Sequence, residues 1–420
     1  MRLFYGWVVV AVAFVTMAVG VNARTAFSLL YPPILDEFGW ERGATAAAFS
    51  FGFVAATALT PFLGRLMDRW GPRRVIPLGV ATVCAGLALA TLVRRPWQLS
   101  LTLGVLVVSG SVAVGYIGHS LFLPNWFVRR RGLAIGVAFS GVGIGSIVLF
   151  PGLQALIGHA GWRAACLTLA ALLAALLIPL NLLFQRHRPE DLGLRPDGDE
   201  RDDRGATGRG GTPSNVVDPA WAAVDWTLAR AIRTSRFWWV FLGFFAGLFP
   251  WYAVQVHQTK YLVEIGFTPG VAAYALGLVG LTGVAGQIAL GNLSDRIGRE
   301  WAWTLACLGF ALCYVILLVM PAHPTPALLY LMVAAQGLLG YGLASVFGAI
   351  PAELFQGRHY GTVFGTLALA ANAGAGTGPW VTGVIHDRTG GYAPAFGLAI
   401  ALSLLSALAI WRAAPRRVRA

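Results

Sequence analysis

The chain has 420 residues, of which 57% are hydrophobic and only 12% are charged. A water-soluble domain of this size needs more charge on its surface, so the composition excludes an ordinary soluble protein. The net charge of +13 does not indicate a nucleic-acid-binding protein, because such a protein gathers basic and aromatic residues on one face and the sequence shows no such cluster.

Apolar runs of about 20 residues recur along the chain, and each is long enough to cross a bilayer. In lipid such a run must be helical, because the backbone has to satisfy its own hydrogen bonds. The sequence therefore predicts an all-α membrane protein with twelve transmembrane helices. Their predicted ranges are 5–34, 43–68, 73–93, 97–126, 131–157, 161–185, 236–264, 268–294, 300–320, 325–355, 358–385 and 390–412.

The basic residues are unevenly distributed over the loops between these helices. With the first residue inside, the cytoplasmic segments hold most of the 31 lysines and arginines. This bias is the positive-inside rule. It predicts a multi-pass protein of the cytoplasmic (inner) membrane with both termini in the cytoplasm.

Two short charged turns, half a chain apart, are the most informative motifs. The first reads GRLMDRWGPRR over 64–74, and the second reads GNLSDRIGR over 291–299. Asp68 and Asp295 are 227 positions apart, as are Gly64 and Gly291. The repeat predicts two pseudo-symmetric six-helix bundles.

These predicted bundles cover residues 1–185 and 236–420. Between them, 186–235 is predicted to be a cytoplasmic linker loop with a short amphipathic helix over Trp221 to Thr234. Two parallel repeats with a site between them at mid-depth are typical of alternating-access transporters.

The helix count and the first charged turn resemble the major facilitator superfamily over nearly the whole chain outside the linker. Three local stretches are similar to the bacterial monocarboxylate transporter-like group: Phe4–Trp7, Pro32–Trp40 and Asn125–Gly132. The resemblance implies a transporter of small carboxylates with a rocker-switch mechanism. The chain departs from this group where carboxylate transporters usually place an arginine on helix 8, since that position is Gln287, and where some carry an aspartate, since that position is Gly283.

In the family, the first charged turn latches the outward-facing state against helix 11. An aspartate there faces the amino end of a helix, where the dipole favours an anion by roughly 0.3–1 kcal/mol. The alternative is that the arginines only set the topology. The expected latch residues are Gly64, Asp68, Arg69, Arg73 and Arg74, with Asp295, Arg296 and Arg299 as a weaker counterpart that closes on helix 5.

Arg24 is the most informative single residue, because a cation at bilayer depth costs about 2.5–3.5 kcal/mol. The sequence places no acid deep in a predicted helix, since Glu264 and Glu353 lie at helix ends. We therefore expect Arg24 to face a cavity and to pair with a substrate carboxylate. The alternative is an arginine that snorkels outward or caps backbone carbonyls.

Other polar side chains in the helices are weaker substrate-binding candidates. Tyr116 and His119 are three apart on helix 4, and His257 and Lys260 are three apart on helix 7. Either histidine could carry a coupled proton, or hydrogen-bond structurally, and Lys260 could snorkel. The remaining candidates, which line the cavity or bridge helices, are Asn22, Tyr252, Gln287, Tyr341 and Asn372.

The sequence contains no nucleophile–base set, nucleotide loop or metal-ligand spacing, so it predicts no enzyme, no cofactor and no metal. The main hypothesis is a monomeric secondary active transporter for a small organic anion, with proton coupling open. An alternative is an exporter of neutral or drug-like compounds, because the helix 8 arginine is missing and helix 7 is rich in aromatic residues. A non-transporting membrane sensor is a third hypothesis.

Overall fold

The computed structural model describes residues 4–40, 42–198 and 218–413. In these ranges the chain forms helices and no β-strand. The elements of the first half are α1 (Tyr5–Thr25), α2 (Phe27–Phe38), α3 (Arg42–Trp70), α4 (Pro72–Ala90), α5 (Pro96–Leu99), η1 (Ser100–Val108), α6 (Ser109–Val114), α7 (Tyr116–Ser120), η2 (Leu123–Asn125), α8 (Arg131–Leu172), η3 (Leu173–Leu177) and α9 (Ile178–Phe184).

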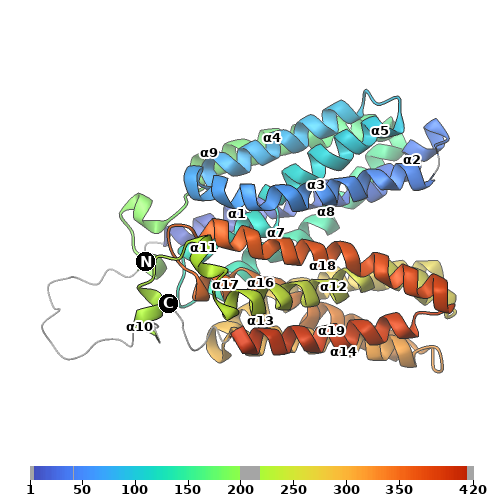
Figure 1. Ribbon diagram of the computed structural model, residues 1–420. Helices are drawn as coiled ribbons and strands as arrows, with labels where there is room; N and C mark the ends of the chain where they lie inside the picture. The colour runs from blue at the N-terminus through green and yellow to red at the C-terminus, as the bar shows by residue number, and fades with distance from the viewer. Residues whose placement is uncertain (1–3, 41, 199–217, 414–420) are drawn as a thin grey trace, which may run out of the picture.

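Short elements lead from the first half to the second: η4 (Pro189–Leu192), η5 (Pro196–Gly198), α10 (Pro219–Ala222) and α11 (Leu228–Ala231). The second half contains α12 (Ser235–Glu264), α13 (Pro269–Ile297), α14 (Arg299–Val319), α15 (Pro326–Ala334), η7 (Ala335–Leu339), η8 (Gly340–Gly342), α16 (Leu343–Phe347), α17 (Ala349–Leu354), α18 (Tyr360–Thr389) and α19 (Ala393–Ala413). The two halves form two bundles that lie side by side (Figure 1).

Nine helical segments in the described ranges are long and apolar enough to cross a membrane. One of them, 131–184, makes two crossings, because Gly161 breaks the helix with φ +80°. The residues before and after this segment lie at the same end of the molecule, since Trp126 donates to the Arg186 carbonyl at 3.3 Å. α3 and α18 have 29 and 30 residues, also enough to span a bilayer. The described residues thus contain the twelve crossings that the sequence predicted.

Three helices that were predicted to be continuous are interrupted. Ala26 separates α1 from α2, and Gly115, with extended backbone, separates α6 from α7. The predicted helix 325–355 consists of five consecutive elements from α15 to α17. Hydropathy could not reveal these breaks, because it reports compatibility with lipid and not backbone direction.

The linker also differs from the prediction, since it forms α10 and α11 in place of one amphipathic helix. The ring centroids of Trp221 and Trp226 lie 4.4 Å apart, and both rings pack on Phe355. Trp221 also donates to the Leu354 carbonyl at 2.7 Å. These contacts fold the segment back onto the second bundle, so the helix cannot continue through it.

The bundles touch along two seams, one between α3 and α18 and one between α8 and α13. Glycines allow the close approach, because a Cβ at Gly64 would collide with the Gly361 carbonyl and a Cβ at Gly132 with the Gly291 carbonyl. Both contacts lie at the end of the molecule where α1 begins and α19 ends, here called the terminal end (Figure 1). Further along the α8–α13 seam, an added Cβ at Gly277, which lies on the same face of α13 as Gly291, would meet nothing within 4 Å. The bundles therefore separate towards the opposite end.

Candidate functional site

Asp68 connects the end of α3 to the beginning of α18. Its carboxylate accepts hydrogen bonds from the backbone N–H groups of Gly361 at 2.9 Å and Thr362 at 2.8 Å, and from the Thr362 hydroxyl at 2.9 Å. The first N–H groups of a helix have no partner within the helix and carry its positive dipole end. The aspartate from one bundle therefore caps a helix of the other.

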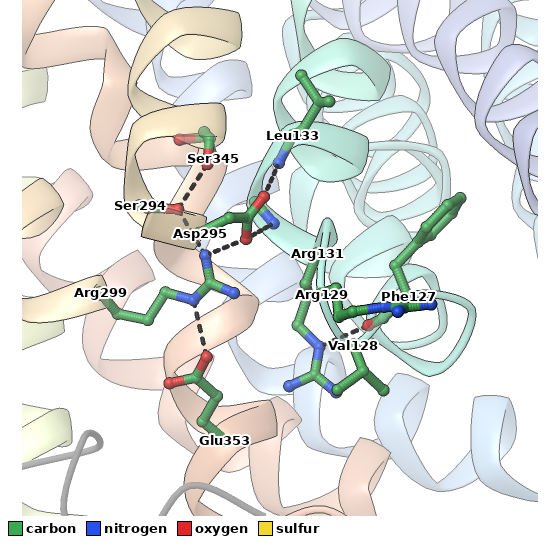
Figure 2. Close-up of polar contacts among 12 residues, drawn as sticks. Phe127, Val128, Arg129, Arg131, Leu133, Ser294, Asp295, Arg299, Ser345 and Glu353 are labelled. Atoms are coloured by element: carbon green, nitrogen blue, oxygen red, sulfur yellow. Dashed lines mark hydrogen bonds and ion pairs between the residues drawn. The ribbon is translucent and has the colours of Figure 1, made fainter. Parts of the chain in front are cut away.

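Asp295 makes the equivalent contact across the other seam. It accepts from the backbone N–H groups of Gly132 at 2.8 Å and Leu133 at 2.9 Å, at the start of α8. Arg299 holds this carboxylate from behind at 2.6 Å and binds Glu353 at 2.9 Å, as Figure 2 shows. The Arg299 side chain is 1% exposed and that of Glu353 is 3% exposed. Glu353 lies near the end of α17, as the sequence predicted, but it is also a buried ion-pair partner, which the sequence did not show.

The remaining arginines of the two charged turns take other positions. Arg73 donates to the Leu182 carbonyl of the same bundle at 2.6 Å. Arg69, Arg74 and Arg296 are exposed at the terminal end. Among the charged residues of the two turns, Asp68 and Asp295 contact the opposite bundle, and Arg299 supports Asp295. We call Asp68 and Asp295, each with the helix start that it caps, the two latches.

Tyr360 adds a third contact between the bundles at the terminal end. Its hydroxyl lies 3.0 Å from the Ser120 carbonyl of the first bundle and 2.9 Å from the Gly348 carbonyl of the second. Arg131 also reaches across, to the Gln356 side chain at 3.2 Å. Polar contacts between the bundles thus close the terminal end at several points.

A cavity of about 90 Å³ lies between the bundles. A water needs roughly 15 Å³ of such space, so the cavity holds about six waters, the scale of a small organic molecule. Arg24 is the one charged side chain among the described residues that line it. The lining residues are Val21, Arg24, Ala56, Ser111, Val112, Gly115, Tyr116, Ile117, Leu248, Trp251, Tyr252, Leu343, Ala344, Phe347, Ala371, Asn372 and Ala375. We call this cavity the chamber.

Four of the ten predicted substrate-binding residues line the chamber, and two more lie directly behind its wall. Tyr116 lies on the same wall as Arg24 and Tyr252, and the Gln287 side chain lies beside its hydroxyl. Tyr341 stacks on Trp251 with ring centroids 4.7 Å apart. A Cβ at Gly283 would lie 2.6 Å from the Tyr341 ring, so this ring fills the space beside the position where some carboxylate transporters have an aspartate.

The other four predicted residues are absent from the lining. Asn22 bridges helices, donating to the carbonyls of Ala18 at 2.7 Å and Val142 at 2.9 Å. His119 is fully buried, with Nδ1 at 3.1 Å from the carbonyl of Gly115. Its ring therefore lies within the first bundle, behind the lining.

His257 and Lys260 lie on α12 nearer the opposite end. His257 Nε2 donates to the Pro379 carbonyl at 2.9 Å, and Nδ1 lies 3.3 Å from the Tyr392 hydroxyl. Lys260 is exposed and lies 3.7 Å from Glu264 on the surface. Both of these side chains are engaged outside the chamber.

Several contacts at or near the terminal end and the seams were not foreseen from the sequence. They are those of Thr60, Thr362 and Tyr360 between the bundles and that of Glu353 with Arg299 within the second bundle. One signal was available for α18, because Gly361 and Gly365 repeat Gly132 and Gly136 at an offset of 229 positions. That repeat marks the beginning of α18 as the partner of a charged turn.

A family model described as Major Facilitator Superfamily matches residues 10–345 and 261–420. The chain belongs to the major facilitator superfamily. It is therefore a multi-pass membrane transporter and not an enzyme, as the sequence predicted.

Relatives of this superfamily member include "Monocarboxylate transporter 13" of Bos taurus, 27% identical with 95% of this chain and 87% of that protein covered. "Monocarboxylate transporter 11" of Mus musculus is 28% identical, with 98% and 88% covered. The "Uncharacterized MFS-type transporter YcxA" of Bacillus subtilis is 23% identical, with 96% and 93% covered.

Solved structures of superfamily transporters share the fold. The transporter FucP in the outward conformation aligns with a TM-score of 0.70 at 16% identity, over 97% of this chain and 98% of that chain. The human organic anion transporter TETRAN aligns with a TM-score of 0.68 at 18% identity, over 97% and 99%. The agreement extends over both bundles and supports the described architecture.

Proposed function

We propose that this transporter moves a small organic anion, a carboxylate, by alternating access, with the carboxylate held by Arg24. The observation that carries the proposal is the position of Arg24 on the wall of a chamber between the two bundles. A guanidinium binds a carboxylate through charge-assisted hydrogen bonds. The names of several relatives support the same class of cargo, since they are monocarboxylate transporters.

The rest of the lining favours an anion with one negative charge and an apolar remainder. Beside Arg24, the polar groups on the wall are Ser111, Tyr116, Tyr252 and Asn372, and the other residues are apolar or glycine. A second carboxylate in such a chamber would be desolvated without a second cation, which is costly. Cargo size is limited by the small volume of the chamber.

The orientation proposed from the sequence gives the latches a role. With the terminal end in the cytoplasm of a cell with an inner membrane, the two latches and Tyr360 close the cytoplasmic side, and the chamber serves the outside. The transporter acts as a monomer, with its substrate site between its own bundles. If a proton moves with the anion, the rate of anion uptake depends on the pH gradient across the membrane, which the following experiment measures.

Uptake into proteoliposomes tests the proposal, with labelled pyruvate, lactate and benzoate as monocarboxylates, with succinate and glycerol for comparison, and with and without a pH gradient. Arg24→Gln should raise the KM for monocarboxylates about 10- to 100-fold, because it removes a charge-assisted contact of about 1.5–3 kcal/mol. Arg388→Gln is the matched control, since Arg388 is exposed at the end of α18 and should leave the KM unchanged. Wild-type uptake of carboxylates by Arg24→Gln would exclude the proposed role of Arg24.

A second candidate is the export of neutral or drug-like compounds, favoured by the apolar lining and by Gln287 at the position of the usual arginine. This candidate predicts that cells expressing the protein survive higher concentrations of lipophilic toxic compounds. It also predicts that Arg24→Gln keeps this protection. Protection without carboxylate uptake would replace the first proposal by the second.

A further inference from the structure

Asn372 belongs both to the chamber and to the α3–α18 seam. It lines the chamber, and its side-chain Nδ2 donates to Thr60 Oγ1 of the opposite bundle at 3.1 Å. Thr60 is fully buried. One side chain thus connects the space for the cargo to an interface that has to part during transport.

The chemistry of Thr60 determines the direction of this bond. The Thr60 hydroxyl donates its own hydrogen to the Ala56 carbonyl at 2.7 Å. Its oxygen is then left to accept, so the NH₂ side of the Asn372 amide must face it. The amide hydrogens are therefore directed towards the seam in this state.

Below this bond the seam continues to the first latch. A Cβ at Gly365 would lie 3.0 Å from the Thr60 carbonyl, and one at Gly64 would collide with the Gly361 carbonyl. Gly361 N–H in turn donates to Asp68 at 2.9 Å. A continuous line of contacts therefore runs from the Thr60–Asn372 bond beside the chamber to the latch at Asp68.

The other seam repeats the backbone contacts of this arrangement. Gln287 lies 227 positions after Thr60, and a Cβ at Gly136 would collide with the Gln287 carbonyl. Its side chain lies beside Tyr116, which also lines the chamber. The contact of Gly365 with the Thr60 backbone is thus repeated by that of Gly136 with the Gln287 backbone. The position that matches Asn372 is Gly143, so the donor side chain belongs to the α3–α18 seam.

We propose that Asn372 is shared between the seam and the cargo: a carboxylate that accepts the Asn372 amide hydrogens draws this side chain away from Thr60 and so weakens the α3–α18 seam. The inference rests on the proposed function, because it needs a carboxylate in the chamber. A ligand shifts a conformational equilibrium only by its differential affinity for the two states, and a shared donor supplies such a difference. Thr60 is then a positioning residue that competes with the cargo for Asn372.

Two substitutions separate this role from a purely structural one. Thr60→Val keeps the shape and removes the acceptor, so Asn372 is released and the dissociation constant for the cargo should fall about fivefold, the value of one hydrogen bond. Asn372→Ala removes the donor, and the dissociation constant should rise several-fold, because a carboxylate is a stronger acceptor than a hydroxyl. Thr60→Ser, which keeps the hydroxyl, should bind like the wild type.

The measurements are calorimetric titration of purified protein with pyruvate, lactate and benzoate, and hydrogen exchange of the Gly361 and Thr362 amides. Both Thr60→Val and Asn372→Ala should speed this exchange without carboxylate, because both loosen the seam above the latch. In the wild type a saturating carboxylate should speed it, and in Thr60→Val it should add little. If Asn372 is shared, the dissociation constant falls in Thr60→Val and rises in Asn372→Ala. A purely structural role of the bond would change the dissociation constant in the same direction in both variants.

Two outcomes would overturn the inference alone: unchanged or weaker carboxylate binding by Thr60→Val, or wild-type exchange that saturating carboxylate does not speed. If the wild type binds none of the three carboxylates, the proposed function fails and this inference fails with it.

Discussion

Arg299 shows how much a single residue contributes to the closed terminal end. It is almost fully buried between the carboxylates of Asp295 and Glu353. Removing one partner of a buried ion pair typically costs about 3–5 kcal/mol, because the other charge is left uncompensated. The guanidinium therefore holds Asp295 in place for the contact with α8, whereas Asp68 accepts its hydrogen bonds from Gly361 and Thr362 of α18.

His187, in the loop after α9, makes stability depend on pH. Burial and the neighbouring Arg188 lower the pKa of His187 from 6.5 to about 4. The unfolded chain then binds a proton at higher pH than the folded chain does, so stability is full above about pH 6.5 and falls as pH drops towards 4. We expect the melting temperature of purified wild-type protein to decline over this range.

The variant His187→Gln should lose that part of the decline, because glutamine does not titrate. Melting temperatures in detergent between pH 4.5 and 7.5 check this prediction. The exposed His323 offers a control, since His323→Gln should keep the wild-type profile. A His187→Gln profile with the wild-type slope would show that another group causes the decline.

At the scale of elements, the α3–α18 seam depends on the absence of side chains at its narrowest point. A Cβ at Gly64 would collide with the Gly361 carbonyl. The added Cβ is fixed to the backbone of α3, and the carbonyl belongs to the backbone of α18. Neither group can therefore move aside as a flexible side chain would. Gly64→Ala should therefore hold the terminal end open and speed the exchange of the Gly361 and Thr362 amides well beyond the wild-type rate.

Gly376→Ala is the matched control on α18, because its added Cβ would meet nothing within 4 Å. Alanine in place of an unconstrained helical glycine stabilises by about 0.4–1 kcal/mol. This variant should melt slightly higher than the wild type and keep its exchange rates. Equal exchange in Gly64→Ala and the wild type would mean that the seam can yield without opening.

The sequence predicts the number of crossings, the two halves and the charged turns, because these depend on hydrophobicity and on a repeat that can be counted. It also predicts that Asp68 faces the start of helix 11, given the resemblance. It does not predict the bond between Thr60 and Asn372 or the burial of Glu353. Those contacts join segments that are far apart in the chain, and only the approach of two bundles decides which polar side chains meet.

At the scale of the whole molecule, the two seams are related by the internal repeat. Each seam ends in an aspartate that caps a helix of the opposite bundle. In each seam a glycine also packs against a backbone carbonyl of the opposite bundle, that of Thr60 or that of Gln287. Two rigid bundles that rock against each other open both seams at one end together. The latches should therefore act on one equilibrium and not on two independent ones.

Asp68→Asn and Asp295→Asn should therefore have additive effects on the closure of the terminal end. Each change keeps the shape, removes the charge at a helix start and replaces one acceptor oxygen by a donor, which should cost roughly 1–2 kcal/mol of closure. Each variant changes the logarithm of the open-to-closed ratio relative to the wild type, and the change in the double variant should equal the sum of the two single changes. Distances between spin labels at Arg130 and Arg358, exposed at the terminal ends of the two bundles, measure that ratio, with Cys84 replaced because it is the half-buried cysteine. A double variant that is no more open than the more open single variant would mean that the bundles do not move as rigid bodies.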